Sequence, residues 1–309
     1  NLNQALLEFI RETVTPENMK LQEPMAAHTT FRTGGEAAVF VEVPGKQQLT
    51  QLVQYMAKIS QEFFVLGKGS NLLVGDKGYP GIVLNLGKRF ARIEVEGNII
   101  RAEAGASLPQ VAVTAMQHGL SGLEFAAGIP GTLLGAVFMN ANGYGSKFAN
   151  VVHSVRTVTR DGRQEKHYTL EEIQYGDSDS VFMHNGDIVL EVVFDLKEGN
   201  PEEIKAVMDE YQASRRAKQP LEKRSAGTMF LRPPGHYVGP MIKGCDLMGF
   251  AIGDAQVSTK HPDFVVNNGK ASATDILAVL HEVQRRVQEK YHVHLPLDVR
   301  MMGEDFSQE

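Results

Sequence analysis

The spacing of apolar and polar residues along the first part of the chain predicts a small α/β unit. Apolar residues recur every three or four positions over 3–14 and 49–59, which indicates two amphipathic helices. Short apolar runs that end in glycine or proline predict strands over 37–43, 63–66 and 81–86. A strand, a helix and a strand in this order are typical of an α/β unit with its loops at the strand ends.

A different pattern begins near Phe90, where short strands dominate. Strands are expected over 92–96, 99–104, 151–159 and 188–196. A helix is predicted from Ser107 to Gly119, because Ser107 is a good cap and Pro109 falls in the first turn. This part of the chain indicates a second α+β unit.

Two strongly capped helices mark a third unit. One is expected over 200–217, where Asn200 is the cap and Pro201 the first helical residue, and another begins at Ser272. A final strand is expected over 293–301. We therefore expect an α+β protein with three domains and a C-terminal strand and tail that return to the active site. The expected ranges are 1–87, 88–199, 200–297 and 298–309.

Length and composition fit a soluble globular protein and exclude several other classes. The 309 residues exceed what a single core usually serves, so two or three domains are expected. A hydrophobic share of 42% with 22% charged residues excludes a disordered, collagen-like or coiled-coil chain. The net charge of −6 gives no global field that would attract nucleic acid.

Several features point to the cytoplasm and away from metals. Cys245 is the single cysteine, which excludes an intramolecular disulfide, fits a reducing compartment and is typical of a small buried residue. Apolar stretches such as 188–194 are too short to span a bilayer, and no signal segment opens the sequence. His292 and His294 alternate along the expected final strand, but no third ligand lies nearby, so no metal site is expected.

The first of two glycine clusters follows the strand expected over 63–66. Gly67-x-Gly69-Ser70-Asn71 would let successive amides approach an anion, with Ser70 and Asn71 as side-chain donors. It matches neither a dinucleotide fingerprint nor a Walker A loop. A plain turn is an equally good interpretation of this cluster alone.

The second cluster reads Gly128-x-x-Gly131-x-x-x-Gly135. Its proline, its small apolar residues and the downstream Asn140 indicate a backbone laid against a large flat ligand. Two such loops in neighbouring units predict one extended cofactor that bridges both.

A basic stretch opens the third unit. Five of the residues between Arg215 and Arg224 are basic and one is acidic, in a protein of net charge −6. This local excess suggests an anionic ligand. A solvated helix end, whose dipole favours cations, remains an open alternative.

Several of these motifs together resemble one family. The stretches TTFRTGG at 29–35, GKGSNLL at 67–73 and GLEFAAGIPGT at 122–132 are similar to the UDP-N-acetylenolpyruvoylglucosamine reductase (MurB) family. The region from Lys243 to Asn267 resembles it as well. The likeness covers nearly the whole chain in the right order, and the chain is closest to the family's shorter, second type.

The resemblance implies a fold, a reaction and two cofactors. The first two domains would have the fold of p-cresol-methylhydroxylase-type FAD binders, and the third would bind the substrate. The implied reaction reduces UDP-N-acetylglucosamine enolpyruvate to UDP-N-acetylmuramate in peptidoglycan synthesis, with NADPH reducing the flavin first. No histidine or cysteine lies in the glycine loops, so FAD is expected to be non-covalent.

The site residues follow from the resemblance together with the loop chemistry. Those expected at FAD are Arg32, Gly67, Lys68, Gly69, Ser70, Asn71, Leu72, Ala126, Ala127, Gly128, Ile129, Pro130, Gly131, Thr132, Gly135, Ala136 and Asn140. Lys218 is the main candidate for the UDP diphosphate of the substrate, with Lys243 as a weaker one.

The chain departs from the family's pattern at its catalytic positions. The arginine that would stabilise the reaction intermediate falls at Gly176 or at Ser178, depending on the alignment, and neither supplies a guanidinium. The proton donor falls at Thr228, and the glutamate at Asp298, one methylene shorter. Arg232 is a candidate for the missing positive charge.

Three functions therefore remain open from the sequence. The first is the reductase itself, a monomer that acts on a UDP-sugar and NADPH, with Thr228 and Asp298 as catalytic residues. The second is a paralogue that binds FAD and a UDP-sugar as a regulatory module without turnover. The third is a flavin oxidase with another small substrate, because related folds host such enzymes.

Overall fold

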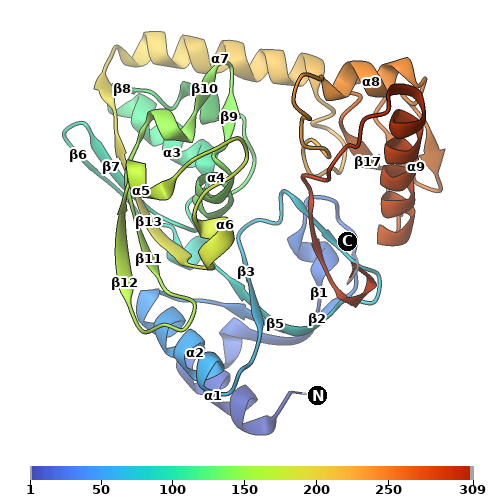
Figure 1. Cartoon of the computed structure of the whole chain (residues 1–309). Coiled ribbons are helices and arrows are strands. Elements are labelled where there is room, and N and C mark those ends of the chain that lie inside the picture. The colour runs from blue at the N-terminus through green and yellow to red at the C-terminus, as the bar shows by residue number, and fades with distance from the viewer. Residues whose placement is uncertain (1, 307–309) are drawn as a thin grey trace. The chain divides into compact units, whose positions relative to one another are not determined.

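The computed structural model describes residues 2–306 and divides into two compact units, each with its own apolar core (Figure 1). Unit 1 comprises the chain up to Leu21 and residues 39–67 and 81–213. Unit 2 comprises residues 22–38, 68–80 and the chain from Ser214 on. The domain boundaries expected after residues 87, 199 and 297 stay a prediction, while compactness groups the chain into these two interleaved units.

Two sheets account for most strands of unit 1, and three of these strands continue into unit 2. The strands are β1 (Met19–Pro24), β2 (Glu36–Glu42), β3 (Phe63–Leu66), β5 (Tyr79–Asn85), β6 (Ile93–Glu96), β7 (Ile99–Glu103), β11 (Val152–Val158), β12 (Glu165–Thr169) and β13 (Ile188–Asp195). One sheet has the order β1-β2-β5-β3, with β3 parallel to β5. The other has the order β12-β11-β13-β7-β6 and is antiparallel throughout.

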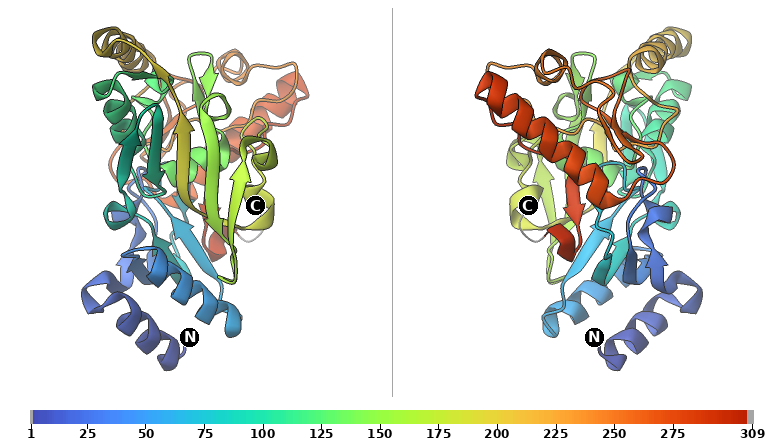
Figure 2. Two further views of the ribbon diagram at one scale, coloured as in Figure 1. Left: turned by 90° about the vertical axis from the view of Figure 1, so that its left-hand side faces the viewer. Right: turned by 90° about the vertical axis from the view of Figure 1, so that its right-hand side faces the viewer.

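Two short antiparallel pairs and seven α-helices complete unit 1. The pairs are β8 (Leu120–Ser121) with β14 (Lys197–Glu198), and β9 (Asn142–Gly143) with β10 (Ser146–Lys147). The helices are α1 (Gln4–Val14), α2 (Lys46–Lys58), α3 (Leu108–Gln117), α4 (Leu133–Met139), α5 (Leu170–Ile173), α6 (Phe182–Asn185) and α7 (Pro201–Lys218), the last of which runs on into unit 2. Helix α4 packs against β13, and the left view of Figure 2 shows the antiparallel sheet that β13 belongs to.

Unit 2 combines a small antiparallel sheet with a parallel strand pair. Its elements are β4 (Leu72–Val74), α8 (Val238–Gly244), β15 (Ala251–Ile252), β16 (Ala255–Val257), β17 (Val265–Asn267), α9 (Ala273–Tyr291) and β18 (Arg300–Met302). Helix α9 packs on the sheet β15-β16-β17. Strand β18 runs parallel to β4, with Arg300 opposite Leu72.

The structure confirms the α+β class and the helices that the sequence marks with caps. The Asn200 side chain accepts the Glu202 amide at 2.9 Å, and the Ser272 hydroxyl accepts the Asp275 amide at 3.0 Å. Cys245 is buried, as expected. None of the helices in residues 2–306 is both long and apolar enough to cross a membrane.

The strand expected over 293–301 is wrong except for its last residues. Residues 293–299 form an isolated bridge, Leu297 to Phe230, instead of a continuous ladder. Pro296 has no amide to donate, and His292 ends α9 in the left-handed region at a φ of 58°. His292 and His294 therefore do not alternate along a strand.

Candidate active site

The first glycine cluster is held against the arm that precedes it in the chain. Gly69 has a φ of +68°, and a Cβ there would lie 2.3 Å from the His28 carbonyl oxygen, so the close approach requires glycine. The Gly69 carbonyl accepts the Thr30 amide at 3.1 Å and the Thr30 hydroxyl at 3.3 Å. The loop over 68–71 and the arm that carries Arg32 are therefore one packed backbone structure in unit 2.

The parallel pair β4 and β18 brings this loop to Asp298. In a parallel pair the residues that precede both strands lie at the same edge. The Asn71 side-chain amide donates to the Asp298 carbonyl at 3.2 Å, and the Arg300 amide donates to the Asn71 carbonyl at 3.0 Å. Asn71 thus ties the loop over 68–71, called the anion loop from here on, to Asp298, although 227 positions separate Asn71 from Asp298.

The candidate proton donor lies on the other side of the Asp298 segment. The Asp298 amide donates to the Met229 carbonyl at 2.7 Å, and the Leu231 amide donates to the Pro296 carbonyl at 2.9 Å. Residues 228–231, called the donor segment from here on, pair in this way with residues 296–298. The Thr228 side chain is exposed while that of Met229 is fully buried, so the hydroxyl faces outward from a fixed backbone.

Asp263, which no motif in the sequence marks, supports the donor segment on the side away from residues 296–298. Its Oδ1 accepts the Met229 and Phe230 amides, each at 3.2 Å, and its carbonyl accepts the Met229 amide at 3.0 Å. The residue is buried, with 7% of its surface exposed. The signal in the sequence is an acid placed directly before the apolar run 264–266.

Burial shapes the protonation of both carboxyls beside the donor segment. Burial raises the pKa of Asp263 to about 8, the Met229 and Phe230 amides oppose that shift, and the charge of Asp298 adds to it. Burial also raises the pKa of Asp298. A second neighbour of Asp263 is His261, whose Nδ1 accepts the Asp263 amide at 3.1 Å and whose pKa is lowered by burial.

In unit 1 the second glycine cluster is a run of small residues that continues into α4. Ala126 and Ala127 are buried, and Gly131 has a φ of +114°. The Thr132 hydroxyl is buried and lacks a hydrogen-bond partner among residues 2–306, and a Cβ on Gly67 would lie 2.3 Å from it. An unpaired hydroxyl beside a bare glycine backbone fits a polar ligand group, which is consistent with the FAD diphosphate expected here.

Both polar atoms of the Asn140 side chain form hydrogen bonds with the protein backbone. Its Nδ2 donates to the Gly176 carbonyl at 3.0 Å, and its Oδ1 accepts the Ala149 amide at 3.0 Å. The residue is buried and ends α4 in the left-handed region, at a φ of 52°. Its side chain therefore fixes two loops around α4.

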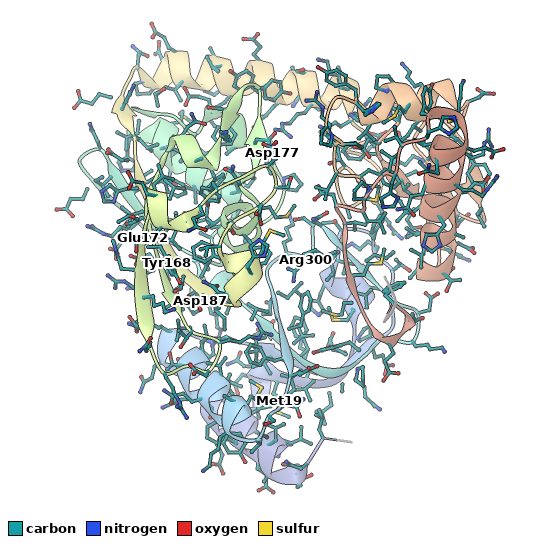
Figure 3. All side chains as sticks on the ribbon, viewed as in Figure 1. Met19, Tyr168, Glu172, Asp177, Asp187 and Arg300 are labelled. Carbon is teal, nitrogen blue, oxygen red and sulfur yellow. The ribbon has the colours of Figure 1, made fainter. Side chains whose placement is uncertain are left out.

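The two positions aligned with the family's arginine lie in a tight hairpin. Gly176 and Asp179 exchange backbone hydrogen bonds of 3.0 and 3.4 Å, with Asp177 and Ser178 at the tip (Asp177 is labelled in Figure 3). The Tyr175 hydroxyl donates to the Val137 carbonyl at 2.7 Å, and the pKa of Tyr175 is raised by burial. The hairpin is thus anchored at its base and carries the exposed Asp177 between the two positions that the resemblance aligns with the family's arginine.

The basic residues near the start of unit 2 have different surroundings. Lys218 and Lys243 are exposed, whereas Arg215 is buried. The Arg232 Nε donates to the His236 carbonyl at 2.8 Å, and its guanidinium carbon lies 4.0 Å from the centre of the Tyr237 ring. Arg232 therefore folds over its own loop.

The predicted site residues divide between the two units. Unit 2 holds Arg32, Lys68, Gly69, Ser70, Asn71, Leu72, Lys218, Thr228, Arg232, Lys243 and Asp298. Unit 1 holds Gly67, Ala126, Ala127, Gly128, Ile129, Pro130, Gly131, Thr132, Gly135, Ala136 and Asn140. Backbone hydrogen bonds unite the anion loop, the donor segment and Asp298 in unit 2, which the sequence could not show.

Comparison with known proteins identifies the family. Residues 37–167 match an FAD binding domain, and residues 219–302 match the C-terminal domain of UDP-N-acetylenolpyruvoylglucosamine reductase. The enzyme of that name from Lactobacillus acidophilus is 44% identical over 93% of this chain and 96% of its own length. The one from Caldanaerobacter subterraneus subsp. tengcongensis is 40% identical over 97% and 99%.

A solved structure agrees with these matches. The UDP-N-acetylenolpyruvylglucosamine reductase (MurB) of Thermus caldophilus superposes with a TM-score of 0.78 at 34% identity. The alignment covers 92% of this chain and 98% of that one. The chain therefore belongs to the UDP-N-acetylenolpyruvoylglucosamine reductase family.

Proposed function

We propose that the protein is an FAD-dependent reductase that converts UDP-N-acetylglucosamine enolpyruvate to UDP-N-acetylmuramate with NADPH. Its family membership and its FAD binding domain support this function. The observation that carries it is the arrangement in unit 2. There, hydrogen bonds hold the anion loop, Asp298 and the backbone beside the exposed Thr228 together.

The residues of each unit suggest a role. In unit 1 the Gly67 backbone and the Thr132 hydroxyl would contact the FAD diphosphate, and the small residues of 126–131 would lie along the flavin ring. In unit 2 the backbone of 68–71 is a further candidate for a phosphate group. When bound, FAD supplies hydride transfer from NADPH to the enolpyruvyl double bond. Thr228 would give its hydroxyl proton to the neighbouring carbon and recover a proton from water.

The substrate would be held by charged residues of unit 2. Lys218 and Lys243 are exposed and would contact the UDP diphosphate. Asp298 would assist proton delivery, because burial raises the pKa of its carboxyl. We place the protein in peptidoglycan precursor synthesis, in the cytoplasm and as a monomer.

The proposed function is tested by following the flavin without oxygen. The purified protein is reduced with NADPH, UDP-N-acetylglucosamine enolpyruvate is added, and the flavin absorbance is recorded. Return of the oxidised spectrum is expected. A flavin that is reduced but stays reduced would contradict this substrate, and a bound flavin that NADPH leaves unchanged would favour a binding module without catalysis.

Arg232 is a candidate for the cation that Gly176 and Ser178 do not supply. Its loop carries it over Tyr237, and its guanidinium remains exposed. Arg232→Ala is expected to slow flavin reoxidation by the substrate while leaving reduction by NADPH unchanged. An unchanged reoxidation rate would exclude Arg232 from this role.

A further inference from the structure

We infer that Asp263 is a positioning residue that holds the donor segment, and thereby Thr228, in place for proton delivery. The carboxyl does this through the amides of Met229 and Phe230 and through no contact of its own with the reacting groups. The positioning role rests on the proposed function, whereas the anchoring of the segment stands independently of it.

Hydrogen bonds hold the donor segment on two sides. On one side the segment pairs with residues 296–298, through Asp298 and Leu231. On the other side its amides turn to Asp263. The segment thus makes a single bridge on one side, and its other neighbour is one residue, Asp263, instead of another strand.

The Met229 and Phe230 amides depend on the Asp263 carboxyl to different degrees. The Met229 amide donates both to the Asp263 carbonyl, at 3.0 Å, and to its Oδ1, at 3.2 Å. The Phe230 amide donates to Oδ1 at 3.2 Å, its one acceptor among the hydrogen bonds of residues 2–306. An unpaired buried amide is costly, so removal of the carboxyl should release Phe230 before Met229.

Thr228 directly precedes the two amides that Asp263 holds. Its side chain is exposed, and no side chain of residues 2–306 is hydrogen-bonded to its hydroxyl, so its direction depends on the backbone that follows. Met229 is fully buried and its carbonyl accepts the Asp298 amide. A shift of the segment would therefore move the hydroxyl and loosen its link with Asp298 together.

Asp263 itself is fixed by its neighbours. Its amide donates to the His261 Nδ1 at 3.1 Å, and the His261 amide donates to the Ser258 hydroxyl at 3.1 Å. The His261 ring packs edge-on against Phe264, with the ring centres 4.9 Å apart. A carboxyl held in this way is preorganised to support the donor segment.

The test compares three variants at position 263 by amide hydrogen exchange and by the two half-reactions of the flavin. Asp263→Ala removes the acceptor, Asp263→Ser keeps a short polar group that cannot reach, and Asp263→Asn keeps an acceptor of the same shape. Asp209→Ala is the control, because it removes an exposed carboxyl on α7 that forms an ion pair with Lys205.

We expect Asp263→Ala and Asp263→Ser to accelerate exchange of the Phe230 amide at least about tenfold, and that of Met229 less. Both variants should slow flavin reoxidation by the substrate about 10- to 100-fold, as expected for a displaced donor, and leave reduction by NADPH unchanged. Asp263→Asn should behave like the wild type in both measurements. A merely structural residue would change both half-reactions and the overall stability together.

Three results would overturn the inference. One is an unchanged Phe230 exchange rate in the Ala or Ser variant, and another is an Asn variant as impaired as Ala. If neither variant folds, a wild-type Phe230 amide that exchanges as fast as exposed amides overturns it as well. A wild-type protein that protects Phe230 but does not reoxidise its flavin refutes the proposed function, and with it the positioning role, while the anchoring stands.

Discussion

The hairpin over 176–179 in unit 1 and the donor segment in unit 2 differ in how the fold holds the positions that the resemblance aligns with the family's catalytic residues. In the hairpin the aligned positions lie at or beside a tip, where neither residue supports the fold through its side chain. In unit 2 the aligned residues, Thr228 and Asp298, lie on backbone that both neighbouring segments hold in place. A substitution at the tip therefore changes charge alone, whereas the backbone of unit 2 preserves the geometry of whatever side chain it carries.

The largest effect expected would break the unit 2 arrangement where Gly69 packs against the preceding arm. Gly69→Val would place a Cβ 2.3 Å from the His28 carbonyl oxygen at a φ of +68° and should abolish FAD binding. Gly97→Val is the matched control. Gly97 also has a positive φ, of +59°, but a Cβ there would meet no other atom of the described residues within 4 Å. Flavin absorbance after gel filtration measures the cofactor content. Equal retention of FAD by both variants would contradict the close-packed loop.

The next prediction adds the missing charge at the hairpin. Ser178→Arg should raise the rate of flavin reoxidation by the substrate about 10²- to 10³-fold, the usual value of a preorganised cation. Gly176→Arg tests the other alignment, since a Cβ there would meet the Asp179 Cβ at an ordinary 3.7 Å. Ser178→Gln controls for length without charge. Stopped-flow absorbance separates the two positions, and no gain at either would show that the hairpin does not serve the substrate.

A smaller effect is expected for the side chain that the unit 2 backbone carries. Thr228→Val removes the hydroxyl at constant shape and should slow reoxidation about 10²-fold, the typical contribution of a general acid. Thr228→Ser keeps the hydroxyl and should remain close to the wild type. Solvent isotope effects on the same step identify the proton transfer. Equal rates for the Val and Ser variants would remove Thr228 from the proposed mechanism.

The smallest effect concerns stability and its dependence on pH. Since burial raises the pKa of Asp263 to about 8, the folded protein retains a proton that the unfolded chain loses near pH 4. Stability should therefore fall as pH rises from about 4 to 8, by on the order of 2–5 kcal/mol. Asp263→Asn should remove most of that slope in urea unfolding from pH 5 to 9, with the part due to Asp298 remaining. Parallel profiles for the two proteins would show that Asp263 is ionised in the fold.

Local signals in the sequence explain which elements could be predicted. The capped helices at 200–217 and from Ser272 are confirmed, because a cap and the residues it bonds lie within one turn. The strand over 293–299 was wrong, because its partners lie far away in the chain and pair with it at a single bridge. Pro296 is the signal in the sequence against a strand there, because proline has no amide to donate to a neighbouring strand.

The candidate site shows the same limit more sharply. The glycine loops and Thr228 can be found by motif, and their roles stay predictions. Asp263 could not be found in this way, because its importance comes from two amides more than thirty positions away. An acid beside an apolar run is a weak signal until the structure shows what it bonds.

The pairing of β18 with β4 also constrains the order of events during synthesis. The anion loop is made early, yet its anchors, Asp298 and Arg300, are made more than two hundred residues later. Contacts across such a separation form late, because a long loop must close first. Cofactor loading should therefore follow translation of residues 298–302, and a nascent chain lacking them should not retain flavin.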